Sequence, residues 1–68
     1  MYRKVDFVAK MNTGDILAAG SMRGIRNNIR AYFSVVPDAF YALIIRDGKP
    51  CAFVWKTHRR ICIVPVQE

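Results

Sequence analysis

Apolar residues occupy every second position of residues 4–11, and charged residues fill most of the positions between them. This period of two predicts a half-buried strand. Residues 12–15, Asn-Thr-Gly-Asp, have the composition of a turn, so we expect Ile16–Ala19 to return as a short second strand. The alternative is a longer helix that begins at Asp15, but Gly20 would then lie inside it at a cost of about 1 kcal/mol.

After Ser21 the spacing of apolar residues changes to three and four, and serine is a residue type that favours helix N-caps. The spacing predicts an amphipathic helix over residues 22–36. We expect Pro37 and Asp38 to end this helix, because proline disfavours helical geometry in the residue before it. The apolar stripe consists of Met22, Ile25, Ile29, Tyr32, Phe33 and Val36.

Three strands are predicted in the last part of the chain. Residues 40–45 are apolar at nearly every position, which is typical of a central strand that is covered on both faces. The pair Asp47-Gly48 is a strong turn signal, after which residues 51–56 are expected to form the returning strand. Residues 57–60 then predict a second turn, and residues 61–66 predict the final strand.

The order of these elements, β-β-α-β-β-β, predicts a small α+β fold in which one amphipathic helix packs across a mostly antiparallel sheet. A chain of 68 residues buries only about 60% of the surface that its unfolded form exposes. We therefore expect residues 1–68 to form a single domain with a thin core.

The two cysteines, Cys51 and Cys62, are too few for the disulfide framework of a small secreted protein. If His58 and Arg59 form a two-residue loop, Trp55 lies opposite Cys62, and the two thiols are several residues apart along the hairpin. We therefore expect no disulfide between them. Both cysteines are expected to be small buried apolar residues.

Targeting signals and membrane spans are not predicted. The basic residues near the N-terminus are followed by Asp6 and Lys10 rather than by the apolar run of a signal peptide. The longest uncharged windows are far shorter than the ~18 apolar residues that a membrane span requires. Together with the cysteine count, this pattern leads us to expect a cytoplasmic protein without a membrane partner.

The sequence gives little support for catalysis or metal binding. His58 is the only histidine, and it lies in a predicted exposed turn, away from the thiols with which it would have to act. Most of the five carboxylates fall in predicted turns, where aspartate bonds local backbone amides. Two cysteines and one histidine cannot close a tetrahedral metal site. We therefore expect a non-enzymatic protein with no catalytic residue, no metal and no cofactor.

One edge of the predicted helix carries Arg23, Arg26 and Arg30 beside Asn27, and no acidic residue balances them. Like charges at this spacing cost about 0.2–0.5 kcal/mol per pair. Arg23 also lies in the first turn, where the helix dipole disfavours a cation. A net charge of +6 is by itself compatible with simple solubility. The unpaired arginines, however, indicate a surface that binds a polyanion or an acidic partner.

A second basic cluster is expected at the tip of the last hairpin, beside the single tryptophan. Trp55 itself is expected to pack in the core rather than to stack on a base. Base stacking requires an exposed aromatic platform. The other flank of the helix carries only small side chains, which another surface could approach closely. The hairpin cluster consists of Lys56, His58, Arg59 and Arg60, and the small flank consists of Gly24, Asn28 and Ala31.

Our leading hypothesis is a nucleic-acid-binding domain for DNA or RNA. Its phosphate contacts would come from the two basic clusters, because the planar guanidinium group can hold a phosphate with two hydrogen bonds. The alternative is an inhibitor or modulator that docks on an acidic surface of a larger enzyme or nucleic-acid machine. Its apolar anchors would be Val35, Tyr41 and Trp55. A homodimer through an edge strand, residues 4–11 or 61–66, is a third possibility, although Pro65 and the lysines oppose it.

Overall fold

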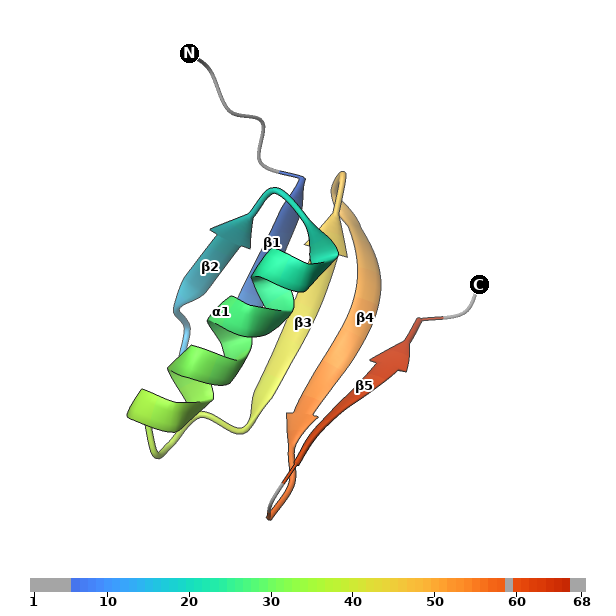
Figure 1. The fold of residues 1–68 in the computed structure, drawn as a ribbon. Helices are drawn as coiled ribbons and strands as arrows, with labels where there is room; N and C mark the ends of the chain where they lie inside the picture. The colour runs from blue at the N-terminus through green and yellow to red at the C-terminus, as the bar shows by residue number, and fades with distance from the viewer. Residues whose placement is uncertain (1–5, 59, 67–68) are drawn as a thin grey trace.

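The computed structural model describes residues 6–58 and 60–66 and contains one helix and one antiparallel sheet of five strands. The elements are β1 (Phe7–Met11), β2 (Ile16–Ala19), α1 (Met22–Val35), β3 (Tyr41–Arg46), β4 (Lys49–Lys56) and β5 (Ile61–Pro65). The strands lie side by side in the order β2-β1-β3-β4-β5, and α1 covers one side of the sheet (Figure 1). The predicted α+β fold with its β-β-α-β-β-β order is therefore confirmed.

Element boundaries differ from the sequence-based prediction by one or two residues. The helix ends at Val35, β3 begins at Tyr41, β4 begins at Lys49 and β5 ends at Pro65. Phe40, which we expected inside the central strand, lies before it with 56% of its surface exposed. Residues 4 and 5 of the first predicted strand lie outside the described residues.

Asn12 fixes one end of the sheet by joining two turns. Its side-chain amide donates a hydrogen bond of 3.0 Å to the carbonyl of Asp38, and its Oδ1 accepts from the backbone N–H groups of Phe40 and Tyr41 at 2.9 and 3.2 Å. The β1–β2 turn is thereby held against the connection between α1 and β3. These bonds satisfy the Phe40 amide without a strand partner.

The β3–β4 hairpin turns at the predicted Asp-Gly pair. Asp47 and Gly48 both have positive φ, 52° and 78°, as a two-residue hairpin turn of type I′ requires. The register then shifts, so that Ile44 lies opposite Ala52 while Ile45 lies opposite Pro50. This bulge accommodates a proline within the strand, because proline has no N–H to donate to the ladder.

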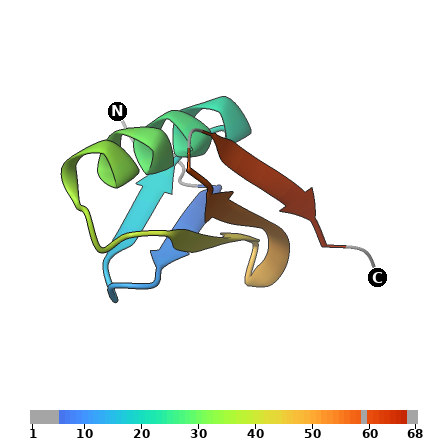
Figure 2. The ribbon, with the colours of Figure 1, turned by 90° about the horizontal axis from the view of Figure 1, so that it is seen from below.

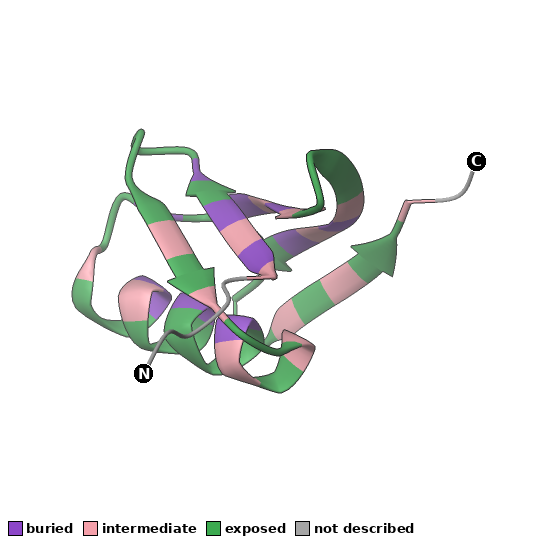
Figure 3. Ribbon diagram, turned by 90° about the horizontal axis from the view of Figure 1, so that it is seen from above, coloured by how far each residue is buried: buried purple, intermediate pink, exposed green. Residues whose placement is uncertain are grey.

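The helix packs on the sheet through a buried stripe, and Ser21 caps it by accepting a 3.0 Å hydrogen bond from the Gly24 N–H. The stripe confirms the predicted amphipathic pattern, and residues of β1, β3 and β4 complete the core (Figure 3). The side of the sheet that faces α1 is called the helix side below. The buried core consists of Phe7, Ala9, Met11, Ile25, Ile29, Phe33, Ala39, Ala42, Ile44, Ala52 and Val54.

The flank of small side chains on α1 packs against the protein's own β2 at two of its three positions. A Cβ atom on Gly24 would lie 3.2 Å from the Cβ of Ala19, so glycine permits this close approach. Asn28 donates a hydrogen bond of 3.2 Å to the carbonyl of Ala18. Asn28 and Ala31 are exposed and Gly24 is half-buried. The close approach expected for this flank is therefore made at Gly24 and Asn28 by β2 of the same chain.

Side chains on the other side of the sheet point away from α1 and form what is called the open face below. Alternation along the strands and the strand register assign its members. They are Val8, Lys10, Ile16, Ala18, Tyr41, Leu43, Ile45, Pro50, Phe53, Trp55, Cys62 and Val64. The one helix among the described residues covers the other face, so within residues 6–58 and 60–66 no element forms a second layer on the open face.

The structure corrects three expectations about burial. Trp55 lies opposite Cys62, as predicted, but Trp55 is 44% exposed rather than part of the core. Cys62 is exposed and Cys51 is only half-buried, so neither is the buried apolar residue that we expected. Both thiols are free, which agrees with the predicted absence of a disulfide between them. In the part of the chain that the structure describes, no helix is long and apolar enough to cross a membrane.

Candidate functional site

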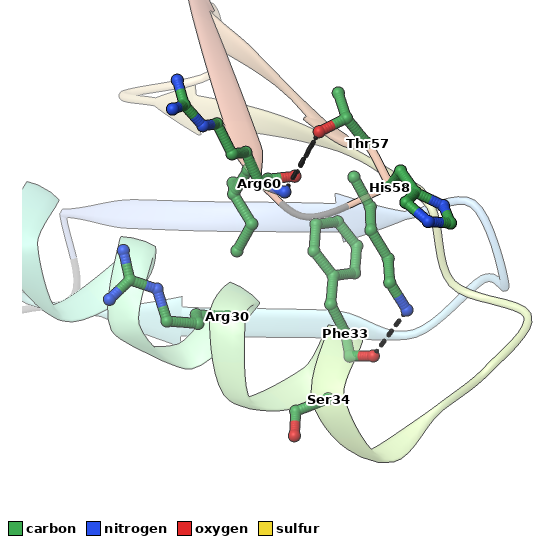
Figure 4. A pocket seen from close by; sticks show the side chains of 8 residues that line it. Arg30, Phe33, Ser34, Thr57, His58 and Arg60 are labelled. Carbon is green, nitrogen blue, oxygen red and sulfur yellow. Dashed lines mark hydrogen bonds between the residues drawn. The ribbon is translucent and has the colours of Figure 1, made fainter.

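The helix edge and the tip of the last hairpin line two adjoining hollows on the helix side. The first, of about 590 Å³, lies between α1 and the β4–β5 turn (Figure 4). The second, of about 390 Å³, runs along the helix itself. Arg30 lines both of them. The first is lined by Arg30, Phe33, Ser34, Lys56, Thr57, His58, Arg60 and Ile61, and the second by Met22, Arg23, Arg26, Asn27 and Arg30.

These residues meet because of the helical period and the curvature of the sheet. With Gly24 and Asn28 packed on β2, the arginines fall on the flank of α1 that faces β4 and β5. Figure 2 shows that the β4–β5 hairpin curls toward the side of the sheet that carries the helix. The curl brings Lys56 and Ile61, which lie opposite each other in this hairpin, to the C-terminal half of α1.

Lys56 ties the hairpin to the helix. Its Nζ donates a partly buried hydrogen bond of 3.0 Å to the backbone carbonyl of Phe33, in the last turn of α1. That turn contains no basic residue of its own, so Lys56 supplies the cation that helix C-termini favour. One of the three donors of this ammonium group is therefore committed to structure, and Lys56 positions the site as well as adding charge to it.

Thr57 and Arg60 close the turn at the hairpin tip. The Thr57 hydroxyl donates to the carbonyl of Arg60 at 2.9 Å and accepts from the Arg60 N–H at 3.1 Å. The Thr57 N–H donates to the same carbonyl at 2.7 Å. This small network leaves the side chains of His58 and Arg60 exposed at the edge of the first hollow (Figure 4). Arg59 lies outside the described residues.

The electrostatic character of both hollows is uniformly basic. Among the described residues that line them, none is acidic. The carboxylate of Asp15 lies on the other flank of the helix, where it accepts a hydrogen bond from the Tyr32 hydroxyl. That bond raises the pKa of Tyr32 above its ordinary value of 10.0. The arginines of the helix edge therefore have no carboxylate beside them in either hollow.

The structure thus brings together the two basic clusters that the sequence left separate. The described members are Arg23, Arg26, Asn27, Arg30, Lys56, His58 and Arg60, and together they are called the basic surface below. Sequence reasoning missed Ser34 and Thr57, which add hydroxyl groups to the first hollow. Ser34 follows Arg30 by four residues, so helical spacing alone was a sufficient signal for it.

The chemistry available on the basic surface is that of hydrogen-bond donors. Guanidinium, ammonium and imidazole groups surround the hollows, and Ser34 and Thr57 supply hydroxyl groups. Within residues 6–58 and 60–66, no group of three or more histidine, cysteine, aspartate or glutamate side chains could hold a metal ion. Groups of this kind can hold an anion through charge-assisted hydrogen bonds.

Comparison of the chain with models of known protein families, with curated proteins and with solved structures gives no significant match.

Proposed function

We propose that the protein is a non-enzymatic nucleic-acid-binding domain of the cytoplasm, and that the basic surface contacts phosphates. The observation that supports this most directly is that Arg30 lines both hollows. The helix edge and the hairpin tip are then parts of one continuous surface. A polyanion with regularly spaced charges can contact both parts at once, whereas a single small anion can contact only one.

The spacing of the helix arginines matches such a ligand. From Arg23 to Arg30 the helix rises about 10 Å, and a duplex strand presents a phosphate every ~3.4 Å along its axis. Arginine suits these contacts because its fork of donors can hold a phosphate with two hydrogen bonds. Contacts of this kind position a protein on the backbone without reading bases, so we propose binding with little sequence preference.

Binding across a salt series to mixed-sequence duplex DNA and to single-stranded RNA tests this proposal. The test variant is Arg26→Gln/Arg30→Gln, and the matched control is Lys10→Gln/Lys49→Gln, which removes the same charge far from the hollows. For the wild type we expect log affinity to fall linearly with log salt. The test variant should lower the duplex slope by roughly 1.8, at ~0.9 for each lost phosphate contact, and the control should leave the slope nearly unchanged.

Two results would overturn the proposal. The wild type could fail to bind either nucleic acid even at low salt. Alternatively, both variants could weaken binding equally, which would show that net charge rather than the basic surface is responsible. Circular dichroism of the variants checks that the fold is retained, and glutamine keeps the helix intact because its helix propensity is close to that of arginine.

A second candidate function, docking on an acidic surface of a larger protein, is favoured by exposed apolar side chains near the basic surface. Val35 at the end of α1 is 76% exposed, and Phe40 follows it in the connection to β3 with its carbonyl bonded to the Lys56 N–H at 2.8 Å. Apolar anchors amid arginines are typical of protein interfaces. The variant Val35→Ser/Phe40→Ser should leave nucleic-acid affinity unchanged under the first proposal. A wild type that binds an acidic protein but neither nucleic acid, with that binding lost in the variant, would favour the second.

A further inference from the structure

The open face is apolar where a solvated sheet would be polar. An antiparallel sheet with one face in water normally alternates apolar and polar residues. In the described strands both alternate sets are largely apolar, and Lys10 is the only charged residue of these strands on the open face. Ile16 is 62% exposed and Val64 is 49% exposed at the two edges. Contiguous apolar surface of this kind marks an interaction site.

The middle of the open face is aromatic. Tyr41 of β3 stacks on Phe53 of β4 with ring centroids 6.0 Å apart, and it tilts against Trp55 at 4.6 Å. Leu43 and Ile45 continue the same face along β3. Enrichment in aromatic residues and depletion of charged ones distinguish the core of a protein–protein interface.

The remaining charged residues of the strands lie on the helix side. The Arg46 guanidinium lies 5.3 Å from the ring centroid of Phe7, Lys49 is the register partner of Arg46, and Lys56 bonds the Phe33 carbonyl. The arginines of α1 lie on the helix side as well. The sheet thus separates a basic side from a side that is almost free of charge.

We propose that the open face is the contact surface between two copies of this chain, in an isologous dimer that buries the aromatic centre. Each copy carries a net charge of +6, so the two copies repel each other on every approach that opposes their basic surfaces. When the open faces of two copies meet, apolar surface contacts apolar surface, and the basic surfaces of both copies point away from the interface. In a two-fold contact the same residues of each copy are buried against those of the other.

Two other modes of association fit the described surface less well. Stacking of nucleic-acid bases on Trp55 requires cations that follow the phosphate backbone along the same groove, and Lys10 is the only strand cation on this face. Pairing of edge strands is opposed by Pro65 in β5 and by the four-residue length of β2. The dimer does not depend on the proposed nucleic-acid binding, and it would leave both basic surfaces accessible.

Sedimentation velocity from low-micromolar to near-millimolar concentration tests the dimer. The test variant is Val64→Lys on the open face, and the matched control is Val35→Lys, which adds the same charge at an exposed valine outside the open face. We expect the wild type and the control to form dimers at high concentration. The test variant should dimerise at least roughly tenfold more weakly, because the contact would bring two added ammonium groups into one interface.

Trp55 provides a second readout that requires no substitution. It is the only tryptophan in the chain, and its 44% exposure would fall on association. Its fluorescence emission should therefore move to shorter wavelength as the protein concentration rises. A wild type that stays monomeric with unshifted emission would overturn the proposal, and so would an equal loss of dimer in both lysine variants. Quenching of Trp55 in a monomer by single-stranded RNA would instead identify the open face as a stacking platform.

Discussion

Trp55 and Lys56 are neighbours in β4 and lie on opposite sides of the sheet, in two surfaces that differ in almost every property. Lys56 reaches the helix side, where it bonds the Phe33 carbonyl and borders a hollow lined by basic residues. Trp55 lies on the open face among apolar residues and against the ring of Tyr41. A strand alternates its side chains with a period of two, so one short segment can serve a charged surface and an apolar surface at once.

The comparison teaches that burial and charge are distributed by the layers of the fold rather than by regions of the sequence. Basic residues from α1 and from the β4–β5 hairpin converge on the helix side. Apolar residues from every strand converge on the open face. The two surfaces can therefore be altered independently, and the following predictions use that independence.

The largest difference is expected between Ile44 and Ile45, which are adjacent in β3 and lie on opposite sides. Ile44 is fully buried under α1, and Ile45 lies partly exposed on the open face. Ile44→Ala should lower the free energy of unfolding by about 2–5 kcal/mol, and Ile45→Ala should lower it by less than half as much. Urea unfolding at low micromolar concentration measures both. Equal losses would mean that the open face is as tightly packed as the core.

Salt should act on the two surfaces in opposite directions. If three phosphates are contacted on duplex DNA, a tenfold rise in salt should weaken binding roughly 500-fold, at ~0.9 log units per contact. Association through the open face should not weaken, because screening reduces the repulsion between two copies that each carry +6. Fluorescence anisotropy with labelled DNA and sedimentation velocity in the same buffers measure the two responses. A dimer that dissociates as salt rises would show that charged groups hold the two copies together. That result would contradict a contact through the apolar open face.

Substitutions of Lys56 and of Arg60 should distinguish a structural role from a binding role within the basic surface. Lys56→Met removes the hydrogen bond to the Phe33 carbonyl and should lower stability by about 1 kcal/mol. Arg60→Gln keeps the backbone bonds that close the hairpin turn. It should change stability by less than ~0.5 kcal/mol while lowering the salt slope of duplex binding by ~0.9. If Lys56 were mainly a phosphate contact, Lys56→Met would leave the free energy of unfolding nearly unchanged and would lower the salt slope of duplex binding. Chemical denaturation and binding measured on both variants distinguish these outcomes.

The smallest effect concerns Tyr32, on the flank of α1 away from the arginines. Its hydroxyl donates to Asp15, which raises the pKa of Tyr32 in the folded state. The stabilisation is therefore fully present below the ordinary tyrosine pKa of about 10, and it is lost as pH rises through the higher folded value. Absorbance titration should show Asp15→Asn returning one tyrosine toward its ordinary pKa. Nucleic-acid affinity at neutral pH should change less than about twofold, since Asp15 lines neither hollow.

Local patterns were sufficient to predict most of the fold. The spacing of Ile25, Ile29 and Phe33 identified the buried side of α1, and the Asp47-Gly48 pair identified its hairpin turn. The two-residue loop assumed at the hairpin tip placed Trp55 opposite Cys62, as observed. Each of these signals depends on residues that are close in sequence.

The open face and the continuity of the basic surface depend on contacts between distant residues. Alternation shows which residues of β3 share a face, but it does not show whether a second layer covers that face. Sequence patterns alone therefore predict Trp55 and Cys62 in the core. Likewise, Arg30 meets the hairpin only because the sheet curls and Lys56 bonds the end of α1.

The position of β1 between β2 and β3 has a consequence for how the chain folds. The β1–β2, β3–β4 and β4–β5 pairs are hairpins of consecutive strands, which close short loops and form quickly. The β1–β3 pair instead joins Met11 to Ala42 across the whole of β2 and α1. Closing that loop costs chain entropy before any of the contacts form, so we expect this pairing to limit the folding rate. β1, the first of the described strands along the chain, is then the last of them to gain its second neighbour.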